Sequence, residues 1–333
     1  MIFTTVGTNK SIFSGHPRDI STTVGKRNSV KIVVVFLVLL SILMTTAVAQ
    51  EAASCVAPKA WVLPSNGNTI QKDAVMKDVL QHRLIMLGEH HQNAEHHKWH
   101  LDMLRDVARH TTNLELAIEM LPRSAQGVLD RWAAGELTEA EFIKKSNWEN
   151  YWFYDVELYM PVLRFAKDKG IKIHAVNVER SLLNLISDVG WDNVPREKRE
   201  GLSKPVVGTK PYLIQLAKSF RRHQPMTMDH SKHNQSLKKE EGDKFARFVE
   251  VQMLWDRAMA EGINSALKQP HQPVVVSIMG SGHMMNGNGA IHQLASINDL
   301  VPMTLIPWDA HLGCSDLAPG YAKYVYGGQL LEH

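Results

Sequence analysis

Five short runs of apolar residues predict the strands of a sheet. They cover residues 83–87, 114–120, 171–176, 273–279 and 303–306, and valine, isoleucine and leucine dominate most of them. Short runs without polar interruption are typical of strands that are buried on both faces. Because helical stretches separate the runs, the pattern predicts an α/β fold in which helices flank a mainly parallel sheet.

Two segments interrupt this alternation of strand and helix. Residues 122–166 are helical in character and rich in aromatic side chains, whereas residues 195–244 are polar throughout. We expect both segments to be helical inserts that form a subdomain or a lid over the sheet edge. For residues 195–244, a solvated loop is the alternative interpretation.

The first 49 residues have the pattern of a targeting segment. Basic residues at positions 26, 27 and 31 flank an apolar run of 13 residues at 32–44, which is followed by Ala47-Val48-Ala49. This order predicts a signal peptide over residues 1–49 and a mature domain over residues 50–333. An uncleaved membrane anchor is the alternative, although the run is short for a membrane span of about 20 residues.

The basic character of the chain belongs largely to this leader. The full chain of 333 residues carries a net charge of +3, and the leader, with five basic residues and one acidic residue, carries +4. The remaining 284 residues therefore carry about −1. Proteins that bind nucleic acid concentrate positive charge on the binding surface, so we expect no nucleic-acid partner.

The two cysteines, Cys55 and Cys314, lie near the two ends of the mature segment. In an oxidising compartment they are candidates for a disulfide that joins the termini. Cys55 has a rival role as a lipid-anchored N-terminus, because Ala52-Ala53-Ser54-Cys55 is similar to a lipobox with Ala52 in the usual leucine position. We favour the disulfide.

Ionisable side chains gather where three predicted strands end. Glu89 and His91 follow the first strand, Glu119 closes the second, and His283 follows the fourth. The carboxyl ends of parallel strands lie at one edge of a sheet, so we expect these four side chains to share a cleft. Such a cleft suits acid–base catalysis, or a metal held by Glu89, His91 and His283. A structural salt bridge is the alternative for Glu119.

Two predicted helices bring further polar side chains towards this edge. His97 shares a helical face with Leu101 and Leu104, so it is either a hydrogen-bonded core histidine or part of a site. Gln252 and Asp256 are spaced i and i+4 beside an apolar stripe, from which they could reach the cleft.

A series of motifs resembles the ChaN-like haem-binding family. The motifs follow one another in order over residues 84–300: Leu87-Gly88-Glu89-His90-His91-Gln92-Asn93 with His97, Glu119-Met120, Gln126 with Leu129-Asp130, Gly135-Glu136-Leu137, Tyr159-Met160-Pro161-Val162-Leu163, Ala175-Val176-Asn177-Val178, Gln252 with Trp255-Asp256, Met259-Ala260, and Gly280-Ser281-Gly282-His283. The resemblance implies an α/β sandwich with an added helical subdomain. It also implies membership of a superfamily with the Tiki metalloproteases and the erythromycin esterases.

This resemblance implies a haem-binding protein of the bacterial cell envelope that takes part in iron or haem uptake, in the periplasm or at the outer membrane. The implied partners are haem and an outer-membrane haem or iron receptor or transporter, and a homodimer is left open. In the enzymes of the superfamily, a Gly-x-x-His motif, acidic residues and a later histidine serve catalysis. Gly88 to His91, Glu119 and His283 match that layout, so a metal-dependent hydrolase is the alternative function.

Haem requires an apolar slot, an axial ligand and cations for its propionates. The candidate haem-binding residues are His97, Tyr151, Tyr154, Tyr159, Gln252 and Asp256. The polar insert offers the cationic side chains Arg221, Arg222, His223, His230 and His233. The sequence has no Cys-x-x-Cys-His motif, which argues against covalent attachment of haem.

Overall fold

The computed structural model describes residues 55–222, 235–308 and 312–328. The expected signal peptide over residues 1–49 lies outside these residues, as do His223, His230 and His233. In the part of the chain that is described, no helix is both long and apolar enough to cross a membrane.

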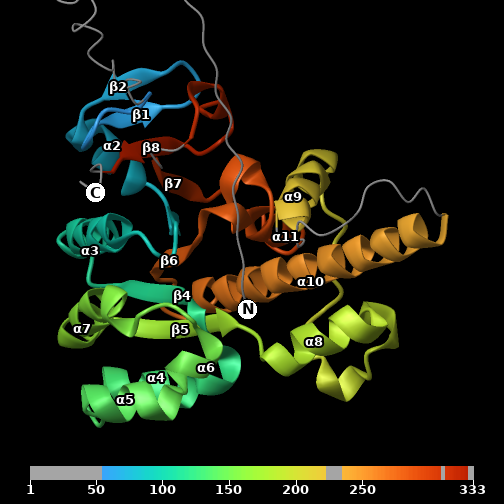
Figure 1. Cartoon of the computed structure of the whole chain (residues 1–333). Coiled ribbons are helices and arrows are strands. Elements are labelled where there is room, and N and C mark those ends of the chain that lie inside the picture. The colour runs from blue at the N-terminus through green and yellow to red at the C-terminus, as the bar shows by residue number, and fades with distance from the viewer. Residues whose placement is uncertain (1–54, 223–234, 309–311, 329–333) are drawn as a thin grey trace, which may run out of the picture. The chain divides into compact units, whose positions relative to one another are not determined.

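An eight-stranded sheet organises the domain (Figure 1). Its strands are β1 (Trp61–Leu63), β2 (Asn68–Ile70), β3 (Leu84–Glu89), β4 (Leu114–Pro122), β5 (Lys172–Asn177), β6 (Val274–Gly280), β7 (Met303–Trp308) and β8 (Tyr324–Gly327). Their order across the sheet is β2-β1-β8-β7-β3-β6-β4-β5. Neighbours from β8 to β5 are parallel, and β1 runs antiparallel to both β2 and β8. The prediction of an α/β fold with a mainly parallel sheet is confirmed.

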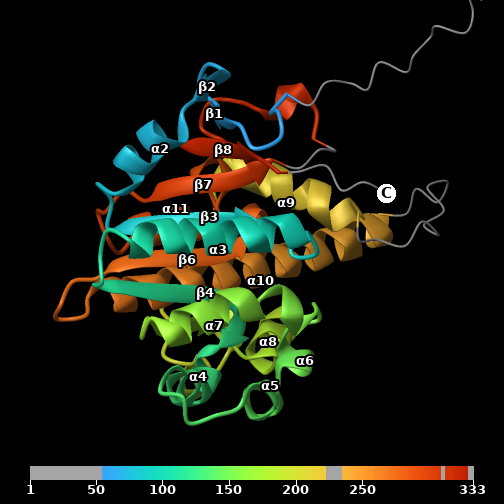
Figure 2. The ribbon, with the colours of Figure 1, turned by 90° about the vertical axis from the view of Figure 1, so that its left-hand side faces the viewer.

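Helices cover both faces of this sheet, as Figures 1 and 2 show. On one face, Ile85 and Leu87 of β3 pack with α2 (Lys72–Val79), α3 (Ala94–Ala108), α4 (Gln126–Ala133), α5 (Glu139–Ser146), α6 (Trp148–Tyr151) and α7 (Met160–Asp168). On the other face, Leu84 and Met86 of the same strand pack with α10 (Gln235–Leu267) and α11 (Ala290–Ala295). Because successive side chains of a strand point to opposite faces, a strand covered on both faces needs an unbroken apolar run.

The two inserts occupy different places on this framework. Residues 122–166 form α4 to α7, and α4, α6 and α7 contact β4 or β5. The described part of 195–244 contains α9 (Lys210–Arg222) and the beginning of α10. The side chains of Tyr212 and Leu216 on α9 pack against Met253 of α10, whereas α8 (Arg180–Val189) packs against α10 through Leu182 and Ile186.

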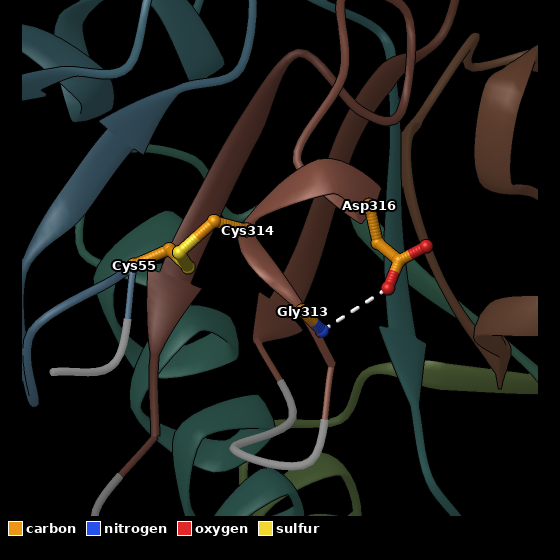
Figure 3. Close-up of a disulfide and its surroundings, with 4 residues drawn as sticks. All are labelled: Cys55, Gly313, Cys314 and Asp316. Atoms are coloured by element: carbon orange, nitrogen blue, oxygen red, sulfur yellow. Dashed lines mark hydrogen bonds between the residues drawn. A yellow bond between two sulfur atoms is a disulfide. The ribbon is translucent and has the colours of Figure 1, made fainter. Parts of the chain in front are cut away.

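Cys55 and Cys314 form a disulfide, with their Cα atoms 5.3 Å apart (Figure 3). Cys55 precedes β1, and Cys314 begins a 3-10 turn after β7, where the backbone N–H of Gly313 donates to Asp316 Oδ2 at 3.1 Å. The two cysteines are 259 residues apart in the sequence. It ties the segment before the first strand to the loop before the last strand.

Candidate functional site

Three neighbouring strands, β3, β6 and β4, carry polar groups to one edge of the sheet. Glu89 ends β3 and pairs in register with Gly280, which ends β6. Glu119 lies near the end of β4, and its Oε2 accepts a hydrogen bond from the Gly280 N–H at 2.7 Å. His283 closes the 3-10 turn that follows β6. The carboxyl edge of the parallel strands therefore holds the residues that the strand pattern placed there.

The first half of the site is built on Glu89. Its side chain is buried, and Oε1 lies 2.6 Å from His91 Nδ1 and accepts a hydrogen bond from the Tyr159 hydroxyl at 2.9 Å. Burial alone would raise the pKa of Glu89, but the His91 hydrogen bond and the nearby histidines outweigh it and lower the pKa. Burial lowers the pKa of His91, but the bond to Glu89 and the charge of Glu119 raise it overall. Glu89 is therefore a carboxylate that orients the His91 ring.

The second half of the site is built on His283. Its Nδ1 lies 2.7 Å from Asp256 Oδ1, and its Nε2 lies 3.6 Å from Glu119 Oε1. Asp256 is fully buried and also accepts a hydrogen bond from the Tyr212 hydroxyl at 2.6 Å. Burial acts to lower the pKa of His283, but Glu119 and Asp256 together raise it from 6.5 to about 9. His283 is thus held as a cation between two carboxylates at neutral pH.

Gly280 lies between the two halves. A Cβ atom built on this glycine would be 2.9 Å from His91 Cε1 and 3.6 Å from His283 Cδ2. Real Cβ atoms essentially never come within 3.0 Å of a ring atom, so a side chain here would force the His91 ring to shift, whereas its contact with His283 would be an ordinary one. The absence of a side chain at Gly280 therefore lets the His91 ring lie against the end of β6.

Aromatic rings border both histidines. The ring centroids of Trp152 and Tyr154 lie 4.8 Å and 4.9 Å from that of His91. On the other side, the Trp255 centroid lies 5.6 Å from His283. The His91 side chain keeps 24% of its surface exposed, whereas that of Glu89 has none. A ligand can therefore reach an imidazole within an aromatic border.

Two further histidines lie behind Glu89 on α3. His97 Nε2 donates to the His91 carbonyl at 3.0 Å, and His100 Nε2 donates to the Gly88 carbonyl at 2.9 Å. The Nδ1 atoms of both rings lie 3.5 Å from Glu89 Oε2. Burial lowers the pKa of His100 to about 4, despite the opposing charge of Glu89. His97 is therefore part of a buried polar cluster and not a lining residue of the open cleft.

The residues that the sequence predicted as metal ligands differ from the group of described residues whose ligand atoms converge. Glu89, His97 and His100 are the group whose ligand atoms all lie within 4.8 Å of one another. The expected set of Glu89, His91 and His283 is not among the groups of described residues that converge in this way. His100 was missed, although its spacing of three residues from His97 places both on one helical face.

The candidate haem residues from the sequence fall in different surroundings. Tyr154 borders His91, but Tyr159 is buried against Glu89. The Tyr151 hydroxyl donates to Glu179 Oε1 at 3.0 Å. Gln252 is partly exposed on α10. Tyr212, which contacts Asp256, was missed because it lies 44 residues away in sequence and no local pattern links the two.

Comparison with known proteins places the chain in a family. Residues 75–294 match the family described as haem-binding uptake, Tiki superfamily, ChaN. No curated protein sequence matches the chain.

The solved structures to which this chain is similar include a ChaN. The structure titled "Cofacial heme binding to ChaN of Campylobacter jejuni" superposes with a TM-score of 0.63 at 16% identity, covering 81% of this chain and 97% of that chain. The type III effector HopBA1 gives a TM-score of 0.42 at 11% identity, covering 77% of this chain and 92% of that chain. A mutant of the erythromycin esterase EreC in its open conformation gives 0.41 at 9% identity, covering 74% and 76%.

The family match spans the strands β3 to β6 and the residues at their carboxyl ends, from Glu89 to His283. The first of these solved structures has the same fold over most of both chains. The chain is a member of the ChaN family of haem-binding uptake proteins, within the Tiki superfamily.

Proposed function

We propose that this protein binds haem at the carboxyl edge of its sheet, with His91 as the residue that reaches the iron. The observation that carries the proposal is the combination of a partly exposed imidazole with an aromatic border, in a chain of the ChaN family. A protein of this family from Campylobacter jejuni is described as binding haem cofacially. The family match favours haem binding over the hydrolase alternative.

The residues at this edge fit the chemical requirements of haem. Trp152 and Tyr154 offer aromatic faces next to His91. Phe153 between them in sequence is 75% exposed, and the Arg180 guanidinium lies 3.9 Å from its ring centroid. An exposed phenyl ring suits a porphyrin face, and a guanidinium suits a propionate. These residues would hold the group non-covalently.

The hydrogen bonds of His91 determine which nitrogen can act. Its Nδ1 faces Glu89 Oε1 at 2.6 Å, so Nε2 is the nitrogen available to a ligand. A carboxylate on Nδ1 fixes the ring orientation and raises the basicity of Nε2. Bound haem would supply an iron that accepts such a nitrogen ligand. Tyr154, whose pKa is raised by burial and by Glu119 and Glu89, would then stay protonated as a neighbour.

Absorbance titration of the purified protein with hemin tests this function. We expect saturation of a Soret band at a fixed stoichiometry for the wild-type protein, and loss of most binding, by roughly 10-fold or more in affinity, for His91→Ala. His90→Ala is the matched control, because His90 is adjacent and exposed. Tyr154→Phe should keep the wild-type spectrum if His91 is the ligand.

Three outcomes would contradict the proposal. The first is no saturable hemin binding by folded wild-type protein. The second is equal binding by His91→Ala and His90→Ala. The third is a spectrum that changes in Tyr154→Phe but not in His91→Ala, which would assign the ligand to the tyrosine.

We further propose that the mature protein acts outside the cytoplasm, in the periplasm or at the outer membrane, in haem or iron uptake. The support is the family description as uptake proteins together with the signal-peptide pattern of residues 1–49. Intact-mass analysis of protein from the envelope fraction should give a mass that lacks residues 1–49. A mass that includes residues 32–44 would indicate an anchor, and lipid on Cys55 would indicate a lipoprotein.

A further inference from the structure

Three nitrogen and oxygen donors converge in the interior behind the cleft. His97 Nδ1 and His100 Nδ1 each lie 3.5 Å from the same atom, Glu89 Oε2. The three residues are buried, with 3%, 4% and 1% of the surface exposed for Glu89, His97 and His100. The two imidazoles belong to one turn of α3, and the carboxylate belongs to the end of β3.

The hydrogen bonds of both rings turn a lone pair towards this point. Each Nε2 faces a backbone carbonyl, that of His91 for His97 and that of Gly88 for His100. A carbonyl oxygen only accepts hydrogen bonds, so each Nε2 carries the ring hydrogen. When the two imidazoles are neutral, each Nδ1 atom presents a lone pair to the carboxylate oxygen, which also has lone pairs. Three acceptors that face one another repel unless a cation lies between them.

Two of these donors have no other partner. Glu89 Oε2 and His100 Nδ1 are buried and form no hydrogen bond, although Glu89 Oε1 is bonded to His91 and Tyr159. A cavity of about 10 Å³ lies beside the two histidines, lined by His97, His100, Tyr159, Trp148 and five aliphatic side chains. This volume is at the lower limit for a single water molecule, which could complete a coordination sphere.

We propose that Glu89, His97 and His100 bind a divalent first-row transition metal ion, with Zn²⁺ the best fit. Two imidazoles and one carboxylate are donors that suit zinc or ferrous iron, and they do not suit calcium or magnesium. Ligand bonds of about 2.0–2.1 Å at tetrahedral angles place neighbouring donors about 3.4 Å apart. The separations of 3.5 Å between the nitrogens and Glu89 Oε2 match that spacing.

This ion would be a structural support beneath the haem edge and does not depend on haem. Metal-binding histidines usually donate their other ring N–H to a carbonyl or carboxylate, which fixes the orientation of the ring. The backbone carbonyls that accept from the two Nε2 atoms would have this role here. Glu89 would use one oxygen for the ion and the other for His91 and Tyr159. The two sites would therefore share a single carboxylate.

Metal binding is tested with Zn²⁺ and Co²⁺ on purified protein that has been stripped by a strong chelator. We expect one Zn²⁺ per chain in competition with a chromophoric chelator, a rise in the thermal midpoint, and the visible d–d bands of four- or five-coordinate Co²⁺. His97→Gln and His100→Gln should each weaken Zn²⁺ binding by roughly 100-fold or more. Because the site is buried, Zn²⁺ is added to the folded protein in one experiment and to the unfolded protein before refolding in another.

His96→Gln is the matched control, since His96 is a buried histidine of the same helix whose Nδ1 accepts from the His90 N–H at 2.9 Å. It should bind Zn²⁺ like the wild type. His283→Gln should also keep the ion, which separates this site from the cleft residues. If stripped wild-type protein takes up no stoichiometric Zn²⁺ by either route, the proposal is overturned. Equal binding by His100→Gln and His96→Gln would overturn it too, whatever the result with hemin.

Discussion

At the scale of single residues, the carboxyl edge is made of two histidines that are held by different carboxylates. His91 depends on Glu89 and stays partly exposed, whereas His283 is fixed between Asp256 and Glu119. Both rings lie close to Gly280, and its lack of a side chain leaves room for the His91 ring. One imidazole is therefore available to a ligand, while the other supplies a fixed positive charge beside it.

That positive charge predicts a dependence of stability on pH. The pKa of His283 is raised from 6.5 to about 9 in the folded protein. Its stabilising contribution is fully present below the unfolded pKa and is lost as the pH rises through the folded pKa. In urea unfolding, the free-energy difference between wild type and His283→Gln should shrink between about pH 6 and pH 10, by up to roughly 3 kcal/mol.

His174→Gln is a suitable control for this measurement. Burial lowers the pKa of His174 despite its hydrogen bond to Glu115, so its protonation changes only at acidic pH. The difference between wild type and this variant should be flat above about pH 7. A flat profile for His283→Gln as well would show that Glu119 and Asp256 do not hold His283 as a cation.

At the scale of elements, the sequence predicted the longer strands of the parallel sheet and missed the three short ones. The strands β3 to β7 lie within the parallel sheet and have nearly unbroken buried positions, so their apolar runs stand out. The strands β1, β2 and β8 have three or four residues, and β2 is mostly exposed. In a strand this short, the order of apolar and polar residues cannot be distinguished from that of a turn.

The position of a residue relative to the long strands explains which site residues could be predicted. Glu89, Glu119 and His283 lie at or just after strands, so the parallel topology alone brings them together. His100 and Tyr212 come from helices that pack from opposite faces, and their positions depend on tertiary packing. The hydrogen-bond partner of each candidate also required the structure, as with Tyr151 and Glu179.

At the scale of the whole molecule, the disulfide between Cys55 and Cys314 joins the first and last parts of the described fold. It closes a loop of 259 residues, for which the chain-entropy argument gives up to about 5 kcal/mol of stabilisation, and less in practice. The Cys55→Ser/Cys314→Ser variant should therefore unfold at a lower urea concentration than the oxidised wild type. Free-thiol titration without reductant should find no thiol in the wild type.

Reductant serves as the internal control for this comparison. It should lower the midpoint of the wild type towards that of the double serine variant and leave the variant itself unchanged. If the oxidised and reduced wild-type proteins unfold at the same midpoint, the bond contributes nothing to the stability of the fold.

The order of strands in the sheet also determines when the fold can form as the chain is made. The central strand β3 pairs with β6 and β7, and β1 pairs with β8, so the early strands find their neighbours only near the end of the chain. Synthesis from the N-terminus cannot complete either pairing ahead of time, and contacts so distant in sequence form slowly. Although β1 pairs with β2 and β4 pairs with β5, the sheet as a whole stays incomplete until the last strands emerge. This delay would suit the export that we propose, because a polypeptide that crosses a narrow secretion channel has to do so before it folds.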